Sequence, residues 1–244
     1  MPDTKKRQGD VLTAIVESYV ETAEPVGSRH VARRLAFSSA TIRNVMADLE
    51  EMGLITHPHT SAGRIPTDKG YRYYIDSLMH LKTVSGQIAR SVQEEYALAM
   101  RSLEDLMETT SHLMAGLTNC VGLTLMSEYD KLYLDGTSHI VEQPEFHDFK
   151  KLYLILKCLD EKRDLLDILR HDYKDERLCI HIGRESGSQD LNDCSIVTRG
   201  YKRKGRVSGR VGVIGPKRMV YERVIPTVEF LADTLTEILN TFEG

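Results

Sequence analysis

An amphipathic helix pattern that runs directly into a short hairpin pattern, over residues 39–66, constrains the fold of this chain most strongly. Apolar side chains recur there at three- and four-residue spacing, which predicts one buried stripe along a helix. The stripe consists of Ile42, Val45, Met46 and Leu49. Ser39 is expected to cap this helix and Gly53 to end it before a strand. The pattern predicts a winged helix-turn-helix fold.

The first two turns of this helix carry polar side chains on the side away from the stripe. Arg43 and Asn44 have the guanidinium and amide groups that match the base edges of the DNA major groove. The hydroxyls of Ser38, Ser39 and Thr41 stand at the helix start, where phosphates bind to free backbone amides. We therefore predict a DNA-contacting helix, and the alternative is a capped helix with an ordinary solvated face.

The hairpin pattern has a polar tip that could follow a DNA backbone as a wing. Its candidate contacts are His57, His59, Thr60, Ser61 and Arg64, with Arg64 in or near the minor groove. The two histidines flank a proline and have no third ligand nearby, so a metal pair is the weaker interpretation. No metal is predicted.

Two helices are expected to precede this segment, and one is expected to follow it. Residues 8–22 are amphipathic, Ser28 is expected to cap a helix that carries Arg29, and a further helix opens near Thr67. Four arginines and no acidic residue lie between positions 29 and 43, although the net charge of the whole chain is −4. A local basic face on an acidic protein is typical of nucleic-acid binding. Residues 1–75 are thus predicted to form a DNA-binding domain, with Arg29 among its contacts.

Residues 76–118 are predicted to stay helical as a connector without proline. Their apolar seam is typical of about three heptads of a coiled coil. It comprises Tyr96, Ala99, Leu103, Leu106, Thr110, Leu113 and Leu117. This segment is either a dimerisation helix or a connector packed on its own second domain, and the pattern does not choose between them.

From residue 119 to 244 the pattern alternates between strands and helices, which indicates an α+β or α/β domain. Strands are expected at 120–126, 131–136, 178–183, 194–201 and 209–215, and helices at 146–170 and 220–242. The four cysteines are widely spaced and are expected to be reduced thiols. No apolar run reaches membrane-spanning length, and the first ten residues lack a signal core. A cytoplasmic, nucleoid-associated protein is expected.

The segment 199–218 is basic and contains no acidic residue. A solvated hairpin is the plainer interpretation, and binding to an anion, an acidic partner or nearby DNA stays open. Gly209, Gly212 and Gly215 lie in and after a strand pattern, without the lysine or helix of a phosphate loop. No nucleophile, general base or metal-spaced carboxylates support catalysis, so no enzyme and no cofactor is predicted.

Several long motifs together closely resemble the family of heat-inducible transcription repressors called HrcA. They are EPVGSRHVARRL, SATIRNVMADLEEMGLITHPHTSAGRIPTDKGYRYYID, GTSHIVEQPEF, IGRE and GRVGVIGPKRMVYERVIPTVEFLADTL. These motifs lie at both ends of the chain and span most of it. The sequence departs from the family in two places. The inserted dimerising domain that family members usually carry is missing, because residues 117–130 run directly into residues 131–146. The turn before the helix at 39 is also slightly short.

The resemblance implies a homodimeric repressor that binds an inverted-repeat DNA operator upstream of chaperone operons. It also implies a winged-helix domain followed by a C-terminal GAF-like domain, with the chaperonin GroEL assisting the active fold. With the long connecting helix expected at 76–118, the predicted fold class is an α+β multidomain protein. Without the insert, pairing would fall on the 76–118 helix or on the GAF-like surface. The implied DNA contacts are Ser39, Thr41, Arg43, Asn44, His59, Thr60, Ser61 and Arg64.

Two other functional classes compete with this prediction. The first is a ligand-sensing regulator whose GAF-like domain binds a small molecule, which an apolar pocket with converging polar groups would favour. The second is an enzyme with a DNA-binding head, of the biotin-ligase kind. It is disfavoured because the sequence contains no catalytic grouping.

Overall fold

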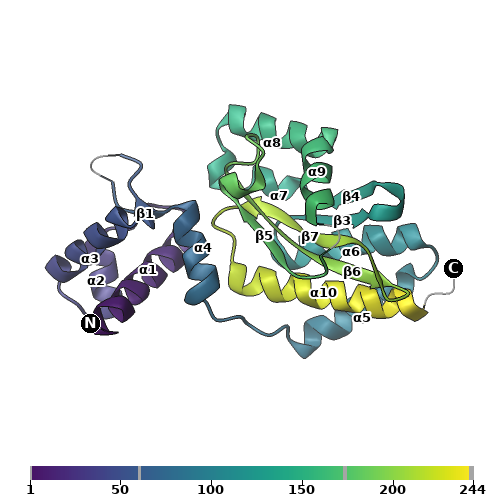
Figure 1. Ribbon diagram of the computed structural model, residues 1–244, viewed down its shortest axis with the longest axis horizontal. Helices are drawn as coiled ribbons and strands as arrows, with labels where there is room; N and C mark the ends of the chain where they lie inside the picture. The colour runs from purple at the N-terminus through teal and green to yellow at the C-terminus, as the bar shows by residue number, and fades with distance from the viewer. Residues whose placement is uncertain (1, 60–61, 173–174, 242–244) are drawn as a thin grey trace. The chain divides into compact units, whose positions relative to one another are not determined.

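The computed structural model describes residues 2–59, 62–172 and 175–241 (Figure 1). The chain divides into two compact units. The first comprises residues 1–80 with 217–220, and the second comprises residues 81–216 with 221–244. The first unit is mainly helical and the second contains a five-stranded antiparallel sheet, so the predicted α+β class is confirmed.

The first unit is a winged helix, as predicted. Its elements are α1 (Pro2–Thr22), α2 (Ser28–Leu35), α3 (Ser39–Glu51), β1 (Ile55–Thr56), β2 (Ile65–Pro66) and α4 (Asp68–Ser77). The predicted stripe of α3 is buried against apolar residues of α1 such as Leu12 and Ile15, which are fully covered. One correction concerns α2, because Gly27 occupies its N-cap position and the predicted cap, Ser28, is its first helical residue.

The wing is a small antiparallel sheet of three segments. β1 and β2 pair with Ile55 opposite Pro66, and Val26 adds a bridge by exchanging two backbone hydrogen bonds with Arg64. At Gly63 a Cβ atom would lie 2.6 Å from the carbonyl oxygen of Pro25. Only glycine fits this contact, so the chain before α2 holds the returning strand of the wing in place.

The predicted continuous helix from 76 to 118 is wrong, because the segment forms two helices, α5 (Gly86–Ala99) and α6 (Leu103–Thr118). Ser102 starts the second helix, where its hydroxyl accepts from the backbone N–H of Asp105 at 3.0 Å. The predicted seam then packs within the chain, and the Tyr96 hydroxyl lies 2.8 Å from Thr110 Oγ1 in a buried hydrogen bond. These buried contacts match the expected connector that packs on its own domain.

The second unit contains the five-stranded sheet in the order β4-β3-β7-β6-β5, with every neighbouring pair antiparallel. Its strands are β3 (Val121–Met126), β4 (Lys131–Asp135), β5 (Cys179–Ile182), β6 (Cys194–Arg203) and β7 (Arg206–Pro216). Its other helices are α7 (Ser138–Val141), α8 (Phe149–Glu161), α9 (Arg163–Asp172) and α10 (Tyr221–Thr241), with 3-10 turns η1 (Ser127–Tyr129), η2 (Pro144–Phe146) and η3 (Gly183–Ser186). η1 alone joins β3 to β4, so this connection carries no inserted domain.

Helices cover both faces of this sheet (Figure 1). Alternate residues of β3 face opposite sides, so Leu123 joins the apolar cluster under α8 and α9, while Thr124 bonds Ser111 of α6 at 2.9 Å. The cluster is filled by fully or nearly fully buried side chains, including Phe146 and Leu165. Among the described residues this cluster is a packed core, which counts against the apolar ligand pocket that the ligand-sensing alternative requires.

The basic segment 199–218 includes the predicted hairpin of β6 and β7, and its cations have different environments. Arg199 pairs with Asp233 at 2.9 Å, and Arg210 is fully buried. Lys217 belongs to the first unit and pairs with Asp68 at 2.8 Å. The segment is therefore not one patch, and only the hairpin tip keeps a group of cations together.

Candidate nucleic-acid interface

The start of α3 is organised by Ser38, which corrects the predicted cap at Ser39. The Ser38 backbone is extended, with φ −68° and ψ 145°, and its hydroxyl accepts from the Thr41 N–H at 3.0 Å. The same hydroxyl lies 2.8 Å from Thr41 Oγ1. Ser39 is already the first helical residue. The structure thus brings Ser38, Ser39 and Thr41 together at the positive end of the helix, where phosphates bind.

Arg43 and Asn44 are exposed on α3, opposite its buried stripe. Within the described ranges, no acidic side chain pairs with the Arg43 guanidinium, so its five donors are available to a ligand. This is the arrangement expected of a side chain that makes bidentate contacts with guanine.

A second group of cations lies on α2, beside the start of α3. Arg29 and Arg33 line a surface hollow of about 500 Å³ together with Phe37 and Ser39. Arg34 points elsewhere and forms an ion pair with Glu17. Sequence reasoning selected Arg29 but missed Arg33. Their spacing of four residues on one helix was the available signal, because it places both on one face.

The short turn between α2 and α3 is closed by a left-handed residue, Ala36, with φ 55°. Its next residue, Phe37, remains 37% exposed and lies under the Arg7 guanidinium, 5.4 Å from the ring centroid. The attraction between a guanidinium and an aromatic face adds a contact between α1 and this turn. The sequence pattern contained no signal for this pair.

The wing is held to α3 by Glu50, a residue that sequence reasoning did not select. Its carboxylate accepts from Arg64 Nε at 2.9 Å and lies 2.6 Å from His57 Nδ1. Burial acts to raise the pKa of Glu50, but the hydrogen bonds from His57 and Arg64 outweigh it and lower this pKa. His57 and Arg64 therefore orient the wing relative to α3, whereas His59 is exposed. The predicted contacts Thr60 and Ser61 lie outside the described residues.

We expect the contacts of the Glu50 carboxylate with His57 and Arg64 to weaken in acid. Because folding lowers its pKa, the carboxylate adds stability above its ordinary value of 4.5 and loses it as the pH falls through the folded value. Glu50→Gln should remove this contribution, so the stability difference between parent and variant should shrink as the pH falls. Urea unfolding from pH 7 to pH 3, with both proteins in a His57→Gln background, isolates the carboxyl. A stability difference between parent and variant that does not change with pH would contradict this role of the Glu50 carboxylate.

The described residues contain no group of three or more histidine, cysteine or acidic side chains that could hold a metal ion. All four cysteines are free thiols. Within the same residues, no helix is both long and apolar enough to cross a membrane.

Two family models match the chain and together cover most of it. Residues 4–78 match the model described as the winged helix-turn-helix transcription repressor, HrcA DNA-binding. Residues 83–225 match the model of the HrcA protein C-terminal domain.

Curated relatives align along nearly the whole chain. The heat-inducible transcription repressor HrcA of Pelotomaculum thermopropionicum is 31% identical, over 96% of this chain and 96% of the relative. The protein of the same name from Geobacter sulfurreducens is 30% identical, over 98% and 99%. The first alignment extends over 335 positions, whereas this chain has 244 residues, so that relative has residues without a counterpart here.

A solved structure has the same fold. The crystal structure of a hypothetical protein matches with a TM-score of 0.75 and 21% identity, and the match covers 97% of this chain and 99% of the other. The agreement therefore concerns the fold of the chain.

Proposed function

Because the chain belongs to the HrcA family of transcription repressors, we propose that it represses heat-shock operons by binding a specific DNA operator. It is a regulator and not an enzyme. The observation that carries the proposal is the grouping of uncompensated arginines and capped helix amides on one unit. Arg43 of α3 supplies base contacts, while Arg29 and Arg33 of α2 supply phosphate contacts. We assign the protein to the cytoplasm, bound to the nucleoid, because its target is chromosomal DNA.

The operator is an inverted repeat and the protein binds it as a homodimer. The support is that each chain contributes one DNA-contacting helix, α3, and a single such helix contacts only one half-site. DNase footprinting at physiological salt tests this, with a duplex of scrambled sequence and a duplex of one half-site as controls. Protection of the inverted repeat alone is the expected result. Equal affinity for the scrambled duplex would refute sequence-specific repression.

The dimer contact lies on the second unit, because the 96–117 seam is used inside the chain. α8 exposes two aromatic residues one turn apart, Phe149 at 83% and Tyr153 at 56%. Exposed aromatic side chains are typical centres of protein interfaces. Phe149→Ser should shift sedimentation toward the monomer, whereas Tyr129→Ser, an exposed aromatic away from α8, should not. An unchanged dimer in the Phe149 variant would place the contact elsewhere.

Arg43 and Arg33 should contribute differently to DNA binding. Arg43→Ala should cost about 1–3 kcal/mol of discrimination at particular base pairs, because Arg43 would contact base edges. Arg33→Ala should weaken all duplexes evenly and lower the salt slope by about 1, as expected for one phosphate contact. Arg34→Ala is the matched control, since Arg34 is engaged by Glu17. Titrations against single-base operator variants at several salt concentrations separate the two roles, and interchanged results would refute the assignment.

The chaperonin GroEL assists the folding of the active repressor. The amount of folded repressor therefore depends on the supply of GroEL. The support for this partner is the family resemblance. Refolding of the diluted chain with and without GroEL and ATP, followed by operator binding, measures the effect. Equal recovery of operator binding in both samples would remove GroEL from the mechanism.

A further inference from the structure

The tip of the β6–β7 hairpin contains one residue, Lys204, that its turn geometry does not favour. Lys204 and Gly205 form the two-residue turn, with φ values of 52° and 74°. Both positions need the left-handed conformation, which glycine, asparagine and aspartate adopt most easily. A lysine at the first position therefore adds charge at a cost in local stability.

The strand ends next to this turn place two like charges opposite each other. Arg203 pairs in register with Arg206, and like charges in this position destabilise a hairpin. The neighbouring Lys202 is neutralised by Glu176. No carboxylate in the described part of the chain forms an ion pair with Arg203, Lys204 or Arg206. The three cations thus repel one another without an internal counter-ion.

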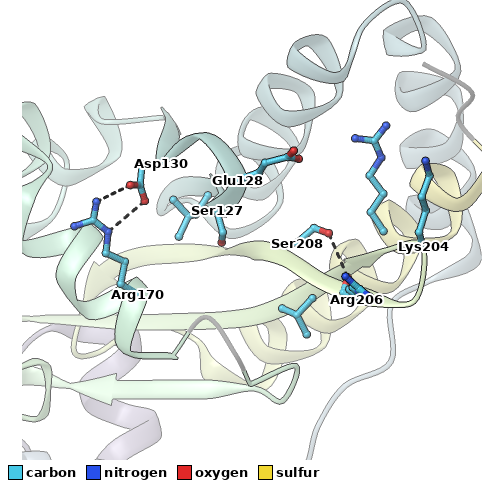
Figure 2. Close-up of a pocket in the computed structure, with 10 residues that line it drawn as sticks. Ser127, Glu128, Asp130, Arg170, Lys204, Arg206 and Ser208 are labelled. Carbon is cyan, nitrogen blue, oxygen red and sulfur yellow. Dashed lines mark hydrogen bonds and ion pairs between the residues drawn. The ribbon is translucent and has the colours of Figure 1, made fainter.

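All three cations line an open cleft of about 1030 Å³ (Figure 2). The register shifts between Tyr201 and Lys202, and this irregularity lets the sequence neighbours Val207 and Ser208 both line the cleft. A regular strand would direct these two side chains to opposite faces of the sheet.

The opposite wall is formed by η1 and the end of α9, where Arg170 contacts Asp130 through a hydrogen bond and an ion pair (Figure 2). Asp130 is thereby neutralised, and Glu128 is the remaining carboxylate among the lining residues. Three cations thus face one carboxylate, which leaves an excess of positive charge.

Two polar atoms of the residues that line the cleft, Arg203 Nε and Ser127 Oγ, are buried without a partner. Nε of Arg203 is shielded from solvent and has no hydrogen-bond partner in the structure. A buried donor left in this state costs free energy, and such donors in native proteins normally have a partner. The cleft therefore lacks an acceptor at the position where its positive charge is concentrated.

From this geometry we propose that the cleft binds a small phosphate-bearing anion. Phosphate oxygens satisfy the planar donors of Arg203 and Arg206, and its charge removes the repulsion between them. The Ser127 hydroxyl, which has no partner in the structure, supplies a further donor, whereas the Ser208 hydroxyl donates to the Arg206 carbonyl oxygen. Leu125 and Val207 add apolar surface on which the organic part of a phosphate ester can pack. The site lies wholly within the second unit, so it is independent of the DNA contacts described above.

Calorimetric titration of the full-length protein at low salt tests the proposal, with tripolyphosphate and ATP as probes. Arg203→Gln combined with Arg206→Gln should weaken the affinity for tripolyphosphate at least tenfold. The matched control combines Arg90→Gln with Lys150→Gln, which changes the net charge equally at exposed positions outside the cleft. Equal weakening in the control would overturn the proposal, because it would show a general charge effect. Failure of the parent to bind either probe would also overturn it.

Thermal unfolding separates a binding role from a structural one. Without a probe, the double cleft variant should melt at or above the parent temperature, because the repulsion across the hairpin is gone. With tripolyphosphate, the parent should gain stability and the variant should not. A lower melting temperature of the unliganded variant would assign the arginines to folding instead. Tighter binding of ATP than of tripolyphosphate would show that the ligand is a nucleotide, and equal binding would show that phosphate alone is recognised.

Discussion

Arg210→Met should lower the free energy of unfolding of the second unit by about 4 kcal/mol, the range expected when one partner of a buried charged network is removed. Arg210 is a charged residue on β7 whose side chain is completely covered. Methionine keeps the apolar stem of the side chain but not the guanidinium head, so the loss combines the missing hydrogen bonds with a small cavity.

The hydrogen bonds of Arg210 explain the size of this effect. Its guanidinium donates to the carbonyl oxygens of Asp172 at 2.8 Å, Arg177 at 3.0 Å and Thr198 at 3.0 Å. It also donates to Thr198 Oγ1 at 3.0 Å and to the Asp175 carbonyl oxygen. Arg210 thereby connects the end of α9 and the start of β5 to the centre of the sheet. Its removal takes the donor from two buried acceptors of Thr198 and from three partly buried carbonyl oxygens, and each buried acceptor left unpaired costs about 1–3 kcal/mol.

Urea unfolding followed by circular dichroism measures the effect, since the chain contains no tryptophan. The matched control is Arg199→Met on the neighbouring strand β6, because Arg199 makes an exposed ion pair with Asp233. Such pairs contribute about 0–1 kcal/mol, so the control should unfold close to the parent. Similar losses in the two variants would show that the buried network contributes little.

The course of the chain was largely predictable from its pattern, because strands and helices with a buried face repeat with fixed periods. The prediction of one continuous helix over 76–118 was wrong because the apolar seam continues from α5 into α6 across the break at Ser102. Ser102, with Glu104 and Asp105 in the first turn, was the contrary signal, since a serine followed by acidic residues marks a helix N-terminus. The burial of Arg210 was not predictable, because its acceptors are backbone carbonyls and any sequence supplies these.

The exposed side of α3 was also predictable, since the stripe that packs inside fixes which residues point outward. The contacts of the wing were less predictable from the sequence. The partners of His57 and Arg64 depend on where the hairpin folds back over α3, and the selection of polar residues did not include Glu50. A carboxylate in a basic region counts against DNA binding when charge alone is considered. Here it orients the wing instead.

Gly70→Ala should destabilise the first unit by about 3 kcal/mol or more and abolish operator binding, while the second unit stays folded. Gly70 lies in the first turn of α4, and a Cβ atom there would stand 1.9 Å from the backbone carbonyl oxygen of Leu54. Alanine is favoured over glycine inside a helix by about 1 kcal/mol, so helix propensity alone predicts the opposite sign.

The clash decides the outcome because backbone atoms on both sides prevent relief. Thr67 donates to the Gly53 carbonyl oxygen at 2.7 Å and accepts from the Gly70 N–H at 3.0 Å, which ties the start of α4 to the turn that precedes β1. Gly27→Ala is the matched control, since a Cβ atom there meets nothing within 4 Å. Hydrogen exchange resolved by segment should show faster exchange across residues 54–74 in the Gly70 variant alone. Retained protection and operator binding in that variant would show that α4 can shift away from β1, and the wing would then be less firmly placed than these contacts indicate.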